Sequence, residues 1–230
     1  MKSLYLILNL GSFLIPFIYS FNKKMNFIRY IAPLFVSITI IAIPYIIWDI
    51  WFTKLGVWGF NPKYYLGFTF FHIPIEEYLF FFCIPYASVF IHYALEFFFP
   101  NLVLHKKYTN LLTVLLIGLS LFIALTNLNK LYTSSNFFVF ALALIFGFLC
   151  SKKSLSRFYI SYLVILIPFI LVNGILTGSI IKEPIVWYNN AENLGIRFGT
   201  IPIEDFAYAF SLLYFVIFTF EILKNKSTYD

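Results

Sequence analysis

Two copies of one short acidic motif are the part of this chain best suited to acid–base chemistry. The first copy, Pro-Ile-Glu-Glu, spans residues 74–77, and the second, Pro-Ile-Glu-Asp, follows 128 positions later at residues 202–205. When two carboxyl groups lie close together, each disfavours ionisation of the other, so one of them can keep its proton. A protonated carboxyl beside an ionised one is the arrangement that acid–base pairs use. The candidate catalytic residues are therefore Glu76, Glu77, Glu204 and Asp205.

Ordinary helix-start chemistry offers a simpler explanation of each copy. Pro74 and Pro202 would occupy the first helical position, and acids in the first turn would cap free N–H groups and complement the helix dipole. Two copies in register, each at the start of an apolar segment, favour a functional role as well, because acids at membrane depth are costly and usually functional. Capping and proton transfer can coexist.

The elements that must position these acids are membrane-spanning helices. Of the 230 residues, 61% are hydrophobic and only 11% are charged, whereas a soluble domain carries about 25% charged residues. A helical span needs about 20 apolar residues, and seven segments qualify. We therefore predict an all-α integral membrane protein. The predicted spans are Ser3–Phe21, Tyr30–Trp51, Pro74–Leu95, Thr109–Asn127, Thr133–Cys150, Phe158–Ile181 and Pro202–Leu223.

The repeated motif divides these spans into two halves. We predict a first three-helix repeat over residues 1–96, a linker helix within 97–132 and a second three-helix repeat over 133–230. A single linker helix keeps both halves in the same orientation, related by an axis along the membrane normal. Both motifs then face one side of the membrane, where Asp49 is expected to join them.

Basic residues predict the orientation of the chain. Lys and Arg are more numerous and more clustered on the side opposite the N-terminus, which predicts a cytoplasmic C-terminus and an outside N-terminus in the cell (inner) membrane. Because these residues lie in short clusters between apolar runs, nucleic acid is not an expected partner. His92, near that cytoplasmic end, is expected at the membrane interface.

Three further residues could support the acids. These are Asp49, His72, which lies two residues before Pro74, and Tyr208. Glu204 and Tyr208 share a helix face, which favours Glu204, and by the repeat Glu76, as the carboxyl that faces a pocket. The two cysteines have no metal-ligand or disulfide spacing and no glycine-rich nucleotide loop occurs, so neither a cofactor nor a metal is expected.

The motif, its duplication and the number of spans resemble the small membrane lycopene cyclases of the heterodimeric type, here with both subunits fused. The family motif is Pro-x-Glu-(Glu/Asp)-x-x-Phe; the first copy matches through Phe80, and the second ends in Tyr208. The resemblance implies a carotenoid-biosynthesis enzyme, an isomerase of the intramolecular lyase type, that converts linear end groups of lycopene or a related carotenoid to rings in the bilayer. It leaves open the ring type, whether one or both ends react, coupling to prenyl transfer, and association with other enzymes of the pathway.

The expected chemistry fits these residues. A proton adds to the terminal double bond, the neighbouring double bond closes the ring, and a proton leaves, so an acid, a base and a dry aromatic pocket are needed. A small parallel-repeat transporter is the main alternative. A retinal-binding receptor is excluded because Pro202–Leu223 lacks lysine, and aspartate-rich prenyltransferase motifs are absent.

Overall fold

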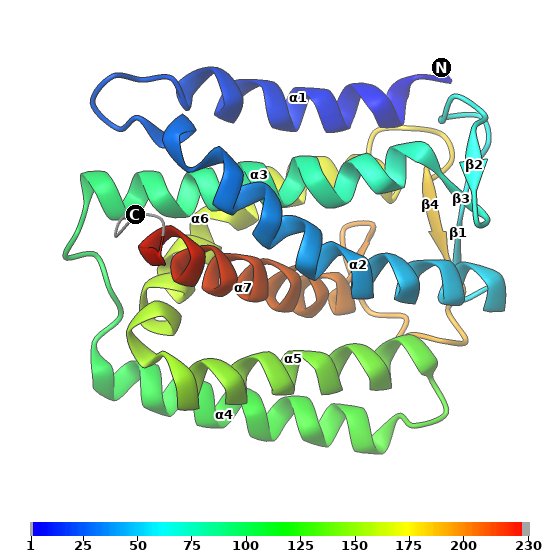
Figure 1. Cartoon of the computed structure of the whole chain (residues 1–230). Coiled ribbons are helices and arrows are strands. Elements are labelled where there is room, and N and C mark those ends of the chain that lie inside the picture. The colour runs from blue at the N-terminus through cyan, green and yellow to red at the C-terminus, as the bar shows by residue number, and fades with distance from the viewer. Residues whose placement is uncertain (1, 227–230) are drawn as a thin grey trace.

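Helices make up most of the protein, which we describe from a computed structural model covering residues 2–226 (Figure 1). This part of the chain holds seven α-helices and three small two-stranded sheets, which confirms the predicted all-α membrane fold. The last four residues of the predicted second repeat, 227–230, lie outside the described residues. The helices are α1 (Leu4–Tyr19), α2 (Ile31–Leu55, preceded by the 3-10 turn η1, Phe27–Tyr30), α3 (Ile75–Phe98), α4 (Lys106–Thr126), α5 (Leu131–Cys150), α6 (Lys152–Leu176) and α7 (Ile203–Lys226).

The described helices differ in how well their lengths match a bilayer. Six of them, α2 to α7, are long and apolar enough to cross one. Helix α1 has 16 residues, which is about 24 Å of helix against about 30 Å of hydrocarbon. It lies along α3 (Figure 1), and their close packing is matched by that of α5 on α7.

Short strands cover the end of the bundle at which α3 and α7 begin (Figure 1). Strand β1 (Trp58–Phe60) pairs antiparallel with β4 (Val186–Tyr188), and Gly59 lies opposite Trp187. These strands are 128 positions apart, the same offset as the acidic motifs. Gly59 and Trp187, at the centre of the ladder, are equivalent residues of the two halves. When equivalent strands pair antiparallel about such a pair, a two-fold axis passes between them. The halves of the molecule are thus related by a pseudo-two-fold axis through this ladder.

Aromatic side chains fill the core of the second half. The ring of Phe210 on α7 lies 4.8 Å from that of Phe158 and 5.0 Å from that of Phe140, centroid to centroid. Gly147 on α5 makes room for Tyr214, because a Cβ there would lie 2.6 Å from the tyrosine hydroxyl. The core therefore fixes α5, α6 and α7 against one another, and with them the start of α7.

Candidate active site

Each acidic motif follows a small hairpin that fixes where its helix begins. In the first half, β2 (Thr69–Phe70) pairs with β3 (Ile73–Pro74), and in the second, β5 (Arg197–Phe198) pairs with β6 (Ile201–Pro202). The motif prolines therefore end a strand, and helices α3 and α7 begin one residue later than the sequence predicts. Proline suits a position at the end of such a short strand, since its missing N–H interrupts no further ladder.

Glu76 and Glu204 hold these hairpins in place. In each half the carboxylate Oε1 accepts the N–H of the residue ten positions earlier, Leu66 or Leu194, at 2.7 Å. Thr133 also donates to Glu204 at 2.7 Å. Both carboxyl groups are fully buried. The sequence predicts that these acids cap the first turn of their own helix, but in the structure their hydrogen bonds go to backbone N–H groups of the preceding loop and, for Glu204, to Thr133.

Glu77 and Asp205 point in a different direction, because successive residues on a helix lie about 100° apart. Tyr5 on α1 donates its hydroxyl to Glu77 Oε2, and its repeat counterpart Tyr132 on α5 donates to Asp205 Oδ1 at 2.5 Å. The two halves therefore hold their second acid by the same tyrosine contact.

Asp205 is the more heavily hydrogen-bonded of the two. Its Oδ2 accepts from Asn173 at 2.8 Å and from the hydroxyl of Tyr188 at 3.0 Å, in addition to the contact from Tyr132. Burial, together with the charge of Asp205, raises the pKa of Tyr188 in strand β4 well above its usual value. This phenol therefore stays protonated and serves as a donor.

Asp49 on α2 joins the two acids, as the sequence predicts. It is 3% exposed, and its Oδ1 accepts the indole N–H of Trp58 at 2.5 Å. Its Oδ2 has no hydrogen-bond partner among the described residues. One buried carboxylate oxygen is thus available to a group that enters from outside the protein.

A cavity of about 550 Å³ brings these groups together. Asp49, Glu77 and Asp205 line it, together with tyrosines and many apolar side chains, whereas Glu76 and Glu204 do not. No Lys, Arg or His lines the cavity in the described part of the chain. The aromatic residues at its carboxyl end are Tyr5, Trp58, Tyr132, Tyr188 and Tyr208.

The structure therefore arranges the predicted residues differently from the sequence in two respects. The pocket-facing acid of each motif is the second, Glu77 or Asp205, and not the first. His72 lies exposed in the β2–β3 turn at a φ of 73° and makes no contact with a carboxyl group among the described residues, so its predicted supporting position is wrong. Tyr208 lines the cavity as predicted.

Sequence reasoning missed the residues that orient the acids, although the repeat contains them. Tyr5 and Asn9 recur 127 positions later as Tyr132 and Asn136. Asn9 donates to the backbone carbonyl of Glu76 at 2.7 Å, and Asn136 donates to that of Glu204 at 2.5 Å. The sequence therefore contains a second repeated motif, Tyr-x-x-x-Asn, at the start of each half, in addition to the acidic motif.

These features define an all-α membrane protein built as a tandem repeat, with carboxyl and hydroxyl groups at one end of an apolar cavity. A comparison with protein families adds the class of activity. The family model described as Lycopene cyclase matches residues 2–95 and again residues 129–223. The chain belongs to the lycopene cyclase family, and its two matched segments cover helices α1–α3 and α5–α7 except for the C-terminal ends of α3 and α7. No curated protein and no solved structure matches the chain.

Proposed function

We propose that this protein is a carotenoid cyclase that closes six-membered rings on the linear end groups of lycopene or a related acyclic carotenoid, by a redox-neutral isomerisation started by a proton. The observation that carries the proposal is the group of Asp49, Glu77 and Asp205 at one end of an otherwise apolar cavity. A hydrocarbon end group offers no polar atom to bind. Carboxyl groups in an apolar cavity can act on it through a proton alone.

Glu77 is the best-placed proton donor. Apolar surroundings favour the neutral carboxylic acid over the charged carboxylate, and Tyr5 is the one hydrogen-bond partner that the described residues give this side chain. The O–H proton moves to the terminal double bond and leaves a tertiary cation. The neighbouring double bond attacks that cation, so one carbon–carbon bond forms, one double bond is consumed and the ring closes.

Asp205 is the best-placed base. Its three donors, Tyr132, Tyr188 and Asn173, stabilise negative charge. A carboxylate near the ring cation offsets its charge and then takes the proton that leaves. One proton enters and one leaves, so the product has the formula of the substrate. The position of the lost proton sets the ring type.

Aromatic walls assist the cation between these two steps. The rings of Trp58, Tyr188 and Tyr208 line the carboxyl end of the cavity, and an aromatic face contributes about 0.5–2 kcal/mol to a nearby cation. Such faces carry no strong nucleophile that would trap the cation. Glu76 and Glu204 act as positioning residues, because they hold the hairpins from which α3 and α7 start.

The transporter alternative has less support. Parallel-repeat transporters form their sites from helices broken near mid-membrane. Here α2, α3 and α6 run without a break through Pro44, Pro85 and Pro168. We further propose that the cyclase needs no bound nucleotide or metal. Flavin absorbance in stoichiometric amount in the purified protein would contradict that proposal.

The proposed location is the cell (inner) membrane, with the N-terminus outside and the C-terminus in the cytoplasm. The orientation is supported by the Lys and Arg residues, which are more numerous and more clustered at the membrane face opposite the N-terminus. A reporter enzyme fused after Asp230 should be active in the cytoplasm. Periplasmic activity of the same fusion would reverse the orientation.

The deciding experiment is expression in a lycopene-accumulating bacterium, followed by chromatography and mass spectrometry of the pigments. The wild-type protein should give cyclised carotenoid with the mass of lycopene, and Glu77→Gln should not. A product of higher mass would show coupling to prenyl transfer. Unchanged lycopene at normal protein level would reject the cyclase proposal.

A further inference from the structure

The cavity extends well beyond the carboxyl groups at its one end. On α3 its lining begins at Glu77 and continues at helical spacing through Ile84 to Ile91, which is about 21 Å at 1.5 Å per residue. Tyr5, Leu8, Ser12 and their neighbours line it from α1. Beyond the carboxyl end the lining is almost entirely apolar. The cavity is therefore a groove that leads away from the acids along the helices.

This groove opens toward lipid between α1 and α6. The two helices meet near the carboxyl end, where Tyr5 packs in one cluster with Leu176, and they contact each other little elsewhere. Ile15, toward the far end of α1, is 65% exposed and Leu171, near the carboxyl end of α6, is 62% exposed, yet both line the cavity. In a spanning bundle, exposed apolar side chains face hydrocarbon. An apolar molecule can thus enter sideways from the bilayer.

Small residues of the first repeat make the room for this groove. Gly11 lines it, and a Cβ at Gly11 would meet nothing within 4 Å. In the repeat, Gly11 corresponds to Phe138, by the offset of 127 that relates Tyr5 to Tyr132. Ala87 on α3 likewise lines the groove. It corresponds to Phe215 on α7, by the offset of 128 that relates the acidic motifs of these two helices. Large side chains thus occupy, in the second repeat, the positions at which the first repeat leaves room for the groove.

We infer that the groove between α1 and α6 holds the extended polyene body of the substrate, with one end group at the carboxyls and the remainder leading out into the bilayer. This inference rests on the proposed function and names how that site takes its substrate. A single groove admits one end of the molecule at a time. A carotenoid with two rings would then require release and re-entry by its other end.

Gly11→Phe tests the inference by placing in the groove the side chain that the second repeat carries at the same position. The matched control is Gly118→Phe on α4, since Gly118 is also a helix glycine at which an added Cβ would meet nothing within 4 Å. Cyclised carotenoid should fall by roughly 10-fold or more in Gly11→Phe, because displacing a substrate by about 1 Å can cost 100-fold. Gly118→Phe should match the wild type.

A second measurement covers the case in which Gly11→Phe fails to accumulate. Gly11→Cys can be blocked after folding with a bulky thiol reagent in membranes, in a Cys150→Ser background, because Cys150 is exposed whereas Cys83 is buried. Labelling should abolish lycopene conversion, and labelling of Gly118→Cys should not.

The outcomes separate the two proposals. If the wild type cyclises lycopene and both Gly11→Phe and labelled Gly11→Cys do so normally, the groove holds a lipid chain or nothing, and the inference is overturned alone. If the wild type forms no cyclised product, the proposed function fails. Time courses add a check, because product with one ring should accumulate before any product with two.

Discussion

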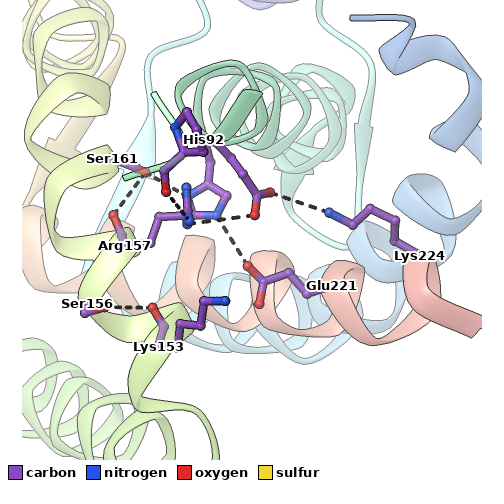
Figure 2. A network of polar contacts seen from close by, with 9 residues as sticks. His92, Lys153, Ser156, Arg157, Ser161, Glu221 and Lys224 are labelled. Atoms are coloured by element: carbon purple, nitrogen blue, oxygen red, sulfur yellow. Dashed lines mark hydrogen bonds and ion pairs between the residues drawn. The ribbon is translucent and has the colours of Figure 1, made fainter. Parts of the chain in front are cut away.

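Carboxyl groups gather at both ends of α3 and α7, but the two ends give them different partners. At the starts of these helices, Glu77 and Asp205 accept hydrogen bonds from tyrosines and an asparagine. At the other end, Glu96 lies beside Arg157 and Lys224, and Glu221 faces His92 (Figure 2). We refer to the first group, with Asp49, as the carboxyl site and to the second, with its partners Arg157 and Lys224, as the ion cluster.

The ion cluster has the composition of a structural network. Glu96 lies 3.8 Å from Arg157 and 3.6 Å from Lys224, nitrogen to oxygen. His92 lies 3.4 Å from Glu221 and 2.8 Å from the hydroxyl of Ser161 (Figure 2). These contacts join α3, α6 and α7. Ion pairs that join three helices in this way serve packing.

The carboxyl site lacks such neutralising partners in the described part of the chain. Its donors are neutral phenols, an indole and an amide. Neutral donors leave a carboxyl group able to gain or lose a proton as the reaction requires. This difference supports our proposal that the carboxyl site reacts, whereas the ion cluster holds helices together.

The largest expected effect comes from removing a titratable proton at the carboxyl site. Glu77→Gln and Asp205→Asn keep the shape of the side chain, and each should lower cyclised product by roughly 10²–10⁴-fold, the usual contribution of a positioned acid or base. Pigment analysis at matched protein level measures this. Glu221→Gln in the ion cluster is the control. Near-normal product from both site variants would refute the assignment of acid and base.

A smaller loss is expected when one donor to Asp205 is removed. Tyr188→Phe deletes only the hydroxyl that lies 3.0 Å from Asp205 Oδ2. Hydrogen bonds to charged groups contribute about 1.5–3 kcal/mol, so the rate should fall roughly 10- to 150-fold if that charge stabilises the ring cation. Tyr19→Phe, at an exposed position on α1, controls for loss of a hydroxyl. An unchanged rate would show that Asp205 needs only its other two donors.

The first acid of each motif should matter less than the second. In Glu76→Gln the amide oxygen can still accept the N–H of Leu66, so the hairpin should survive. The expected loss of product is much smaller than for Glu77→Gln, because Glu76 does not line the cavity. Parallel assays of the two adjacent variants measure the ratio. Equal losses would show that the pair shares its proton and acts as one unit.

Much of this arrangement could be predicted from the sequence, because apolar length and the motif repeat are local patterns. The seven helices occur where predicted, and the acids of both halves meet at one end. The sequence predicts the start of α6 at Phe158, six residues after the observed start at Lys152. The first two turns of α6 contain charged residues, so a search for apolar segments begins the helix too late. One of these residues, Arg157, is nevertheless buried, against Glu96 and the carbonyl of Pro100.

Other features depend on contacts between distant segments. Which carboxyl faces the cavity is set by the hairpins that rotate α3 and α7, and no spacing in the motif reveals that rotation. The sequence predicts His92 at the membrane interface, yet this side chain is 2% exposed, because its partner Glu221 comes from the other half of the chain. The position of Tyr188 at Asp205 requires the β1–β4 pairing across the two-fold axis.

Breaking the ion cluster should affect stability and leave the chemistry intact. Arg157→Met removes the contact to Glu96 and the 3.0 Å hydrogen bond to Pro100. A hydrogen bond from a charged group contributes about 1.5–3 kcal/mol, so the thermal midpoint of the solubilised protein should fall. Product per folded molecule should hold. A loss of product at an unchanged thermal midpoint would place the ion cluster in the reaction and erase the distinction between the two ends.

The smallest effect is expected from the one ion pair that the described residues form near the carboxyl site. Lys63 donates to Glu183 at 2.8 Å, between the loops of the two halves, and both side chains are well exposed. Lys63 lowers the pKa of Glu183, so any stability from the pair is present at neutral pH and is lost as the pH falls through that lowered value. Water and salt screen exposed pairs strongly. Lys63→Met should therefore leave both the thermal midpoint and the product unchanged at neutral pH. A clear rise in product would mean that this cation acts on the carboxyl site over a distance. Without the charge of Lys63, the surroundings of Glu77 would favour the protonated carboxyl group, and so proton donation, more strongly still.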